Sequence, residues 1–210
     1  VIKLDATGNI LWQNTIGGDS LDEINDMILT PDGGVLCGGY SKSGISGDKT
    51  EACLGEEDFW LVKLDALGNI QWQNTIGGSS RDWMNALANT MDGGYICGGY
   101  SISPISGDKT ESPKGAGDYW IVKLDNAGNV VWDKTIGASM HDELYDILPT
   151  ADGGYVCGGE SNSMPSGDKS EWPHAYDYWI VKIDSTGEKV WDNSIIAYEY
   201  DYLRSMVLAV

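Results

Sequence analysis

Short apolar runs alternate with polar, glycine-containing turns along the whole chain, and no longer segment keeps a helical period. The run at 118–124 shows the pattern clearly. In a strand, Trp120 and Val122 would point to one face and Tyr119 and Ile121 to the other, so both faces are apolar. A strand of this kind needs cover on both sides. We therefore expect sheets that pack against a neighbour on each face.

One stretch of the chain illustrates the unit that these runs form. An Asp-Gly-Gly turn at 92–94 joins two extended runs, and such turns need positive φ angles that glycine adopts without a steric clash. A polar loop at 103–117 and a second turn at 125–129 precede two further runs. The unit therefore contains four predicted antiparallel strands, at 84–90, 95–101, 118–124 and 130–136.

This unit is repeated along the chain with a period of 60 residues. Its Asp-Gly-Gly turn stands at 32–34, at 92–94 and at 152–154. A repeat of this length fixes the architecture, and four-stranded units arranged radially are the blades of a β-propeller. The predicted fold class is all-β, a partial β-propeller of four-stranded antiparallel blades. A linear stack of sheets is the alternative.

The copies at the two ends of the chain are incomplete. A closed four-bladed ring would leave the first and third strands of the terminal blade without the strand that pairs them, so we interpret the chain as part of a longer protein with about three and a half blades here. The predicted pieces of the single repeat domain 1–210 are 1–17 (third and fourth strands), 22–77, 82–137 and 142–196 (complete blades) and 201–210 (a first strand).

Three strings carry a resemblance to a known repeat. They are a Ser-Gly-Asp-Lys-Thr/Ser-Glu loop (46–51, 106–111 and 166–171), an Asp-Tyr-Trp-Ile-Val-Lys-Leu-Asp strand (118–125) and an Asp-Gly-Gly-Tyr hairpin (92–95). They resemble a repeat of large secreted bacterial surface proteins, which often end in the sorting domain of the type IX secretion pathway. The resemblance implies a propeller-like module that is secreted or displayed on the bacterial cell surface. It implies no defined reaction and no catalytic residues.

The formal net charge of −19 narrows the classes of partner. Such a surface repels phosphate backbones and anionic membranes, and no stretch approaches the roughly 20 apolar residues of a transmembrane helix. We therefore expect neither nucleic-acid binding nor membrane insertion. The expected partners are other cell-surface proteins, glycans or further blades of the same parent chain. The acidity either keeps an extracellular surface soluble or reflects a need for divalent cations.

The cysteine pattern does not indicate a disulfide framework. Cys37, Cys97 and Cys157 occupy equivalent places in successive copies, so the fold should hold them apart as small buried hydrophobic residues. Cys53 lies in a loop, and a bridge between Cys37 and Cys53 is the alternative interpretation.

Carboxylates recur in the long loop of each copy and could hold Ca²⁺, which takes six to eight oxygen ligands. Their spacing matches no EF-hand loop. In the alternative interpretation, Asp48 and its equivalents cap a turn while Lys49 pairs with a nearby acid. The candidate calcium ligands are Asp48, Glu51, Asp58, Asp108, Glu111, Asp118, Asp168, Glu171 and Asp177.

Two further sets of aspartates follow the repeat. Those just before each first strand are typical of residues that accept backbone hydrogen bonds and fix the link between blades, with a ring of carboxylates near a central channel as the alternative. They are Asp22, Asp82, Asp142 and Asp201. The other set starts Asp-x-x-Gly turns and is accounted for by turn chemistry. It consists of Asp5, Asp65, Asp125 and Asp184.

Tryptophans at repeated strand positions are predicted to form the core between blades. They are Trp12, Trp60, Trp72, Trp120, Trp132, Trp179 and Trp191. Aromatic residues that break the repeat are better candidates for stacking on a sugar ring. These ligand-binding candidates are Trp83, Trp172, Tyr176, Tyr198 and Tyr200.

Conventional catalysis has little support in the sequence. The two histidines, His141 and His174, have no zinc-type spacing, and no Ser-His-Asp set or glycosidase carboxylate pair stands out. We expect a non-enzymatic structural or adhesive module that requires no cofactor beyond the Ca²⁺ considered above. Its loops at 42–57, 102–117 and 162–176 would present the binding surface. A carbohydrate-binding or carbohydrate-cleaving propeller is the alternative.

Overall fold

The computed structural model describes residues 1–173, 175–195 and 203–208, and these residues form strands, turns and loops without a helix. The strands are β1 (Ile2–Leu4), β2 (Ile10–Gln13), β3 (Asp22–Leu29), β4 (Val35–Ser41), β5 (Asp58–Leu64), β6 (Ile70–Ile76), β7 (Asp82–Asn89), β8 (Tyr95–Ser101), β9 (Asp118–Leu124), β10 (Val130–Ile136), β11 (Asp142–Pro149), β12 (Tyr155–Ser161), β13 (Asp177–Ile183) and β14 (Lys189–Ile195).

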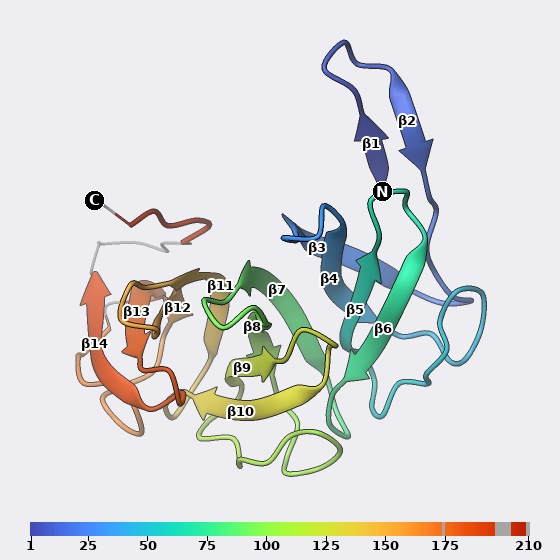
Figure 1. Cartoon of the computed structure of the whole chain (residues 1–210). Coiled ribbons are helices and arrows are strands. Elements are labelled where there is room, and N and C mark those ends of the chain that lie inside the picture. Colours follow the sequence, from blue (N-terminus) through green and yellow to red (C-terminus); the bar gives the residue numbers. More distant parts are fainter. Residues whose placement is uncertain (174, 196–202, 209–210) are drawn as a thin grey trace.

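The strands form one hairpin and three four-stranded antiparallel sheets. β1 pairs with β2, and the sheets are β3-β4-β5-β6, β7-β8-β9-β10 and β11-β12-β13-β14, each in chain order. The sheets follow one another side by side, and the row that the described residues form is not closed into a ring (Figure 1). The predicted all-β class of repeated, propeller-like blades is confirmed.

The predicted strands of the second copy are confirmed, with a shift at its first strand. β7 begins at Asp82, two residues before the predicted start, because Asp82 pairs with Ser101 at the end of β8. It ends at Asn89, since the Thr90 backbone N–H turns back to the Gly94 carbonyl (3.0 Å). The three other strands have the predicted bounds.

A buried lysine on the third strand holds each Asp-Gly-Gly turn in place. In the second sheet, the Lys123 ammonium lies 2.9 Å from the Asp92 carboxylate and donates to the Leu124 carbonyl (3.0 Å). Gly93, within the turn, has a φ of 85°, a conformation that residues with a Cβ rarely adopt. Hydrogen bonds from Thr90 and Lys123 lower the pKa of Asp92 to about 2, so this carboxylate stays charged.

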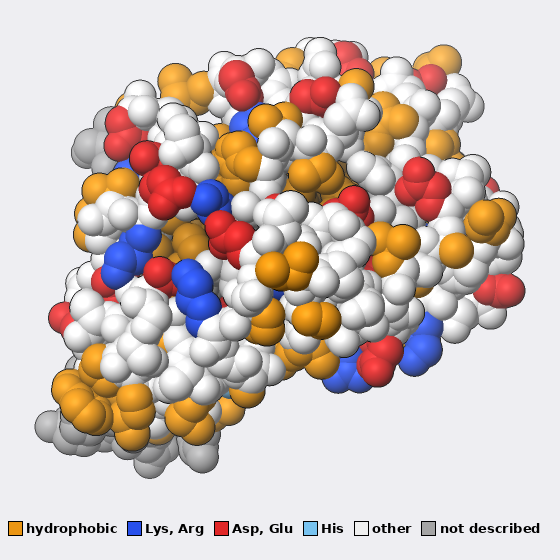
Figure 2. Space-filling view, turned by 90° about the horizontal axis from the view of Figure 1, so that it is seen from below, with side chains coloured by type: hydrophobic (Ala, Val, Ile, Leu, Met, Phe, Trp, Pro, Cys, Tyr) orange, Lys and Arg blue, Asp and Glu red, His pale blue; other side chains and the backbone are white. Residues whose placement is uncertain are grey.

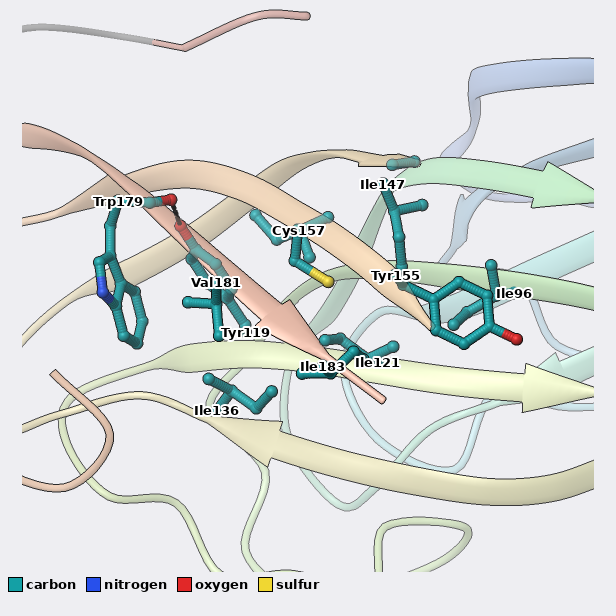
Figure 3. Packing of buried hydrophobic residues seen from close by; sticks show 12 residues of the cluster. Ile96, Tyr119, Ile121, Ile136, Ile147, Tyr155, Cys157, Trp179, Val181 and Ile183 are labelled. Carbon is teal, nitrogen blue, oxygen red and sulfur yellow. Dashed lines mark hydrogen bonds between the residues drawn. The ribbon is translucent and has the colours of Figure 1, made fainter. Parts of the chain in front are cut away.

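The hydrophobic core lies between sheets, as the two-faced strand predicted. On β9, Trp120 and Val122 pack in the cluster between the first and second sheets. Tyr119 and Ile121 pack in the cluster between the second and third sheets, part of which Figure 3 shows. The Tyr119 hydroxyl also donates across this interface to the Trp179 carbonyl (2.9 Å). Each inner sheet is therefore stabilised by contacts on both faces.

The first sheet, which among the described residues only the β1–β2 hairpin covers on its outer side, shows the effect of incomplete cover. Ile24 of β3 is 42% exposed, whereas its equivalents Met84 and Leu144 are fully buried against the preceding sheet. Met27 is likewise exposed, although its equivalent Leu87 is buried. Burial of these positions therefore depends on the neighbouring sheet and is not a property of the single blade.

Tryptophans of the third strand are buried between sheets as predicted, but those of the fourth strand lie at the rim. Trp72 is half-buried over the turn that contains Gly128 of the next sheet, and Trp12 lies over Gly68 in the same way. Trp191 is 45% exposed, which corrects the prediction that it is a core residue. No turn of a following sheet covers it within the described part of the chain.

Residues 203–208 do not form the predicted first strand of a further blade. The segment nevertheless occupies the place of one, because the Met206 side chain lies against Gly158 as Met84 lies against Gly38. Its backbone is also held by the carboxylate of Asp146 (2.5 Å). A strand assignment requires a ladder partner, and none of the described residues pairs with this segment.

All four cysteines are free thiols, so the alternative of a bridge between Cys37 and Cys53 is wrong. Cys37, Cys97 and Cys157 are buried, as predicted. Cys53 is half-buried, and its sulfur lies 2.9 Å from the Ser41 carbonyl oxygen.

The paired glycines of the second strand have two different roles. A Cβ at Gly98 would lie 3.3 Å from Leu144 of the next sheet, so this glycine lets the next sheet approach closely. A Cβ at Gly99 would lie 1.9 Å from the Trp83 carbonyl oxygen of its own sheet. The reason is a bulge in β7 between Met84 and Ala86, which brings the β7 backbone over Gly99.

We expect Gly99→Ala to destabilise the protein by about 3 kcal/mol or more, because the clash is with backbone that cannot move aside. Gly98→Ala is the matched control and should cost less than about 1.5 kcal/mol, since the Leu144 side chain can adjust. Urea unfolding of both variants measures the difference. Equal losses in the two variants would contradict this account of the bulge.

Candidate functional site

The aspartates at the blade entrances bind backbone amides, as predicted. The Asp82 carboxylate accepts hydrogen bonds from the Gly78 backbone N–H (2.7 Å) and the Ser103 hydroxyl (2.9 Å). Asp142 accepts the equivalent bonds from Ala138 (2.7 Å) and Ser163 (3.0 Å). These carboxylates fix the link that enters each blade. Asp22 has the same role in the first sheet, and Asp201 lies outside the described residues.

The loop carboxylates proposed as calcium ligands also accept hydrogen bonds from the backbone. Asp108 accepts one from the Gly77 N–H (3.1 Å), as Asp48 does from Gly17 (3.2 Å) and Asp168 from Gly137 (3.0 Å). Glu111 accepts one from the Thr135 N–H of the fourth strand (2.8 Å). Glu51 and Glu171 make the equivalent bonds to Thr75 (2.8 Å) and Ser194 (2.6 Å). The long loop is thus fastened at two points, to the link that enters its blade and to the fourth strand of its own sheet.

The third carboxylate of each loop is buried at the start of the third strand. Asp118 is fully buried and accepts hydrogen bonds from the backbone N–H groups of Lys114 (2.7 Å) and Gly115 (3.4 Å). Asp58 binds Leu54 and Gly55 in the same way, and Asp177 is also fully buried. Burial, reinforced by nearby Asp142, raises the pKa of Asp118 to about 6.

The structure does not gather the nine calcium candidates into clusters. Within the described residues, no three of them bring carboxylate oxygens within 4.8 Å of one another. The alternative pairing of Lys49 with an acid is also not seen. The Lys49 ammonium lies 5.1 Å from the centre of the Trp60 ring and donates to the Thr75 hydroxyl (2.5 Å). This cation–π contact recurs at Lys109 and Lys169, and it braces the loop against the sheet.

The five sugar-binding candidates fall into three groups. Trp172 is 68% exposed. Tyr198 and Tyr200 lie outside the described residues. Trp83 and Tyr176, by contrast, belong to one continuous set of rings that crosses all three sheets.

We call this set the aromatic row, defined as Tyr40, Trp83, Tyr100, His141 and Tyr176. Successive ring centres lie 5.5, 6.1, 4.9 and 5.9 Å apart. Every ring in the row is half-buried. Tyr40 and Tyr100 lie near the ends of β4 and β8, and Trp83 lies at the start of β7. His141 and Tyr176 immediately precede β11 and β13. The row therefore runs from sheet to sheet, along the edge of the molecule where these strands begin or end.

Charged side chains line the first half of the row. The Arg81 guanidinium lies 4.8 Å from the Trp83 ring centre and pairs with Glu57 of the preceding sheet (3.0 Å). Tyr40 donates its hydroxyl hydrogen to Glu23 (2.6 Å). The buried indole N–H of Trp83 has no hydrogen-bond partner. The Asp82 backbone N–H donates to the Glu57 carbonyl (2.7 Å), and this bond links the two sheets beside the row.

The second half of the row contains a compact group of three potential metal ligands, which we call the His–Glu–Glu cluster. His141 Nε2 lies 3.3 Å from Glu143 and 3.9 Å from Glu160. Glu143 and Glu160 are direct partners across β11 and β12, so their side chains share one face. The His141 backbone N–H is fixed by the side chain of Asn162 (3.0 Å).

The electrostatics of this cluster follow from burial. Glu160 is only 4% exposed, and its Oε2 atom has no hydrogen-bond partner. Desolvation and the neighbouring Glu143 raise the pKa of Glu160 to about 7. The hydrogen bond to Glu143 raises the pKa of His141 above its ordinary value. Burial and the same carboxylates raise the pKa of the Tyr145 phenol, which hydrogen-bonds to Glu143.

The row and the cluster occupy positions at which the copies differ. Arg81 and His141 are equivalent to Leu21, and Trp83 is equivalent to Glu23 and Glu143. Two neighbouring positions also differ between copies. One is occupied in successive copies by Tyr40, Tyr100 and Glu160, and the other by Glu57, Gly117 and Tyr176. The backbone is the same in all three sheets, so only the side chains differ along this edge.

Sequence reasoning identified Trp83 and Tyr176 from this departure from the repeat, but it missed most of the row. The same signal was available for Arg81, Glu143 and Glu160, since none of them is kept in all copies. What it did not reveal was their proximity, which depends on cross-strand register and on contacts between sheets.

The acidic composition does not produce a uniformly acidic surface. On the face seen from below, Lys and Arg side chains lie beside Asp and Glu side chains, with apolar side chains between them (Figure 2). Lys134, for example, pairs with Glu188 (2.6 Å) and Glu111 (3.3 Å). Among residues 1–173, 175–195 and 203–208, no helix has the length and apolar character needed to cross a membrane.

Comparisons with known proteins give remote likenesses. No family model matches the chain. The regulatory protein FlaEY of Caulobacter vibrioides is 24% identical over 157 residues, which cover 70% of this chain and only 16% of that protein. Among solved structures, Sqt1 from Chaetomium thermophilum is 17% identical with a TM-score of 0.38, over 85% of this chain and 36% of that one. A Bacteroides caccae protein of unknown function is 14% identical with a TM-score of 0.30, over 91% and 73%.

We expect the buried Asp118 to make stability depend on pH. Its raised pKa means that the folded chain keeps this proton up to about pH 6, whereas the unfolded chain releases it near the ordinary value of 3.8. The free energy of unfolding should therefore fall as pH rises from about 4 to about 6, by up to about 3 kcal/mol for this group.

Asp118→Asn should remove that part of the pH dependence. Urea unfolding at pH 4, 5, 6 and 7 measures it as the difference between wild type and variant. The equivalent Asp58, whose pKa is also raised to about 6, remains in both proteins as a common background. Parallel pH profiles for the two proteins would show that Asp118 does not titrate in this range.

Proposed function

We propose that this chain is a non-enzymatic recognition module of an extracellular, repeat-built bacterial protein, and that it binds its target along the aromatic row. The observation that carries the proposal is the convergence of non-repeated residues on a repeated backbone. A scaffold residue recurs in each copy because each sheet needs it. Residues that differ between copies, and yet lie in contact with one another, suit a surface that makes one specific contact.

The residue types in the row support recognition. Aromatic side chains and arginine are enriched where binding energy concentrates in interfaces. Trp83 and Arg81 stack on each other, which holds both side chains in position before a ligand arrives. The long loops suit this role less well than their sequence suggested, because their carboxylates and lysines are already engaged in bracing the sheet.

A glycan is the target class that the row favours. Half-exposed rings offer flat faces for sugar stacking, and the flanking Glu23, Glu57 and Arg81 can hydrogen-bond to hydroxyl groups. Cleavage of the glycan is less well supported. Glu143 and Glu160 have oxygens within 4.8 Å of each other, closer than the roughly 5–5.5 Å of retaining glycosidases.

We expect the purified chain to bind members of an immobilised glycan array through the row. Trp83→Ala should weaken that binding at least about tenfold, as loss of a central aromatic anchor does. Trp172→Ala is the matched control, an exposed tryptophan outside the row, and should change affinity less than about twofold. Titration with the soluble form of each bound glycan gives the affinities.

The unfolding midpoints of both variants show whether a loss of binding results from a loss of folding. Arg81→Ala is a second variant, beside the row, since the Arg81 guanidinium stacks on the Trp83 ring. Binding that survives Trp83→Ala and Arg81→Ala but not Trp172→Ala would place the contact on the loop instead. A wild-type chain that binds no glycan would contradict the glycan class.

A further inference from the structure

We propose that His141, Glu143 and Glu160 form a binding site for one divalent transition-metal ion of the zinc type. This inference does not depend on the proposed recognition function. It begins from geometry, since His141 Nε2 lies 3.3 and 3.9 Å from the two carboxylates. Ligand atoms around a tetrahedral zinc ion, at bond lengths of about 2.0–2.2 Å, lie about 3.4 Å apart. The three side chains therefore need only small movements to share one ion.

A second, independent observation is the state of Glu160. The residue is more than nine-tenths buried, its Oε1 atom faces the imidazole, and its Oε2 atom has no hydrogen-bond partner. A buried carboxylate oxygen without a donor is costly, and a bound cation removes that cost. Two described side chains, His141 and Arg204, favour the charged form of Glu160, and Arg204 stacks on the Tyr145 ring at 4.9 Å.

The donor set selects the class of metal. One imidazole nitrogen with two carboxylates suits Zn²⁺ and its neighbours in the first transition series. Ca²⁺ prefers six to eight oxygen ligands and gains little from imidazole. This site also differs from the calcium candidates of the loops, since it shares no residue with them.

The surroundings provide the support that metal ligands need. The backbone N–H of His141 is bound to Asn162, and its carbonyl accepts a hydrogen bond from the Asn162 backbone (3.1 Å). Tyr145 hydrogen-bonds to Glu143 and fixes that carboxylate. Contacts of this kind orient ligands and raise metal affinity.

Three protein ligands leave at least one coordination position open. The ring of Tyr176 lies 5.9 Å from that of His141 and forms a wall beside the cluster. A bound ion at this end of the row would thus hold a water molecule or an oxygen atom of a ligand.

The chain contains its own negative controls. The equivalent positions are Leu21, Glu23 and Tyr40 in the first copy, and Arg81, Trp83 and Tyr100 in the second. Neither of these sets can chelate a metal ion. The ligand set is therefore specific to the third copy, on a backbone that all three copies share.

The test is a Zn²⁺ titration of the whole chain, produced without a histidine tag and treated with a chelator that is then removed. Cys53→Ser serves as the parent, because Cys53 is the one thiol that is not fully buried. Competition with a chromophoric indicator gives stoichiometry and affinity. Co²⁺ in place of Zn²⁺ gives an absorption spectrum that reports coordination by the protein.

We expect one equivalent of Zn²⁺ to bind the parent. Glu160→Gln and His141→Leu should each weaken binding at least about tenfold, because each removes a ligand. Leucine occupies the equivalent position in the first copy, so the second variant is compatible with the fold. Glu23→Gln, at the first-copy equivalent of Glu143, is the matched control and should leave the affinity within about twofold. Zn²⁺ should raise the unfolding midpoint of the parent and of Glu23→Gln, but not of His141→Leu.

Three results would overturn the assignment. The first is the absence of saturable Zn²⁺ uptake by the parent. The second is uptake that His141→Leu and Glu160→Gln leave unchanged, which would indicate binding elsewhere on the acidic surface. The third is displacement of Zn²⁺ by an equal concentration of Ca²⁺, which would exclude a site built around imidazole.

Discussion

The structure depends on burial of both faces of each third strand between neighbouring sheets. Trp120 and Tyr119 are adjacent in sequence and lie in different hydrophobic clusters, one on each side of the second sheet. A blade cannot supply that cover itself, as the exposed Ile24 shows where no described sheet lies against it. Each sheet is thus stabilised mainly through its neighbours, which is the physical basis of repeat architectures.

Close stacking leaves many polar groups away from water, and the repeated polar residues satisfy them. Asp82 accepts a hydrogen bond from a backbone N–H at the blade entrance. Asp108 fastens the long loop to the link that enters the blade, and Glu111 fastens it to the fourth strand. Lys109 is buried against the Trp120 ring, and desolvation lowers its pKa to about 8. Residues that recur in every copy of this chain therefore have a structural role, even where they are charged and resemble metal ligands in sequence.

The residues of the aromatic row and the His–Glu–Glu cluster differ between copies, and they lie together along one edge of the molecule. The aromatic row and the His–Glu–Glu cluster share His141, so the proposed recognition surface and the proposed metal site lie side by side. The rigid sheets place Trp83 and Glu143 at equivalent backbone positions with entirely different neighbours. Such a scaffold can acquire a new site by changing side chains alone, without changing the fold.

The elements could be predicted from the amino-acid sequence alone: the 60-residue period, the strands at 95–101, 118–124 and 130–136, and the turns that need glycine. These follow from local rules, since alternation and turn chemistry act within a few residues. Which residues lie in contact depends on the tertiary structure. Pairing of Glu143 with Glu160 depends on strand register, and the distinct roles of Gly98 and Gly99 depend on a bulge and on the next sheet. Contacts between residues so far apart along the chain depend on how the sheets pack and pair, and the spacing of residues in the sequence does not reveal this.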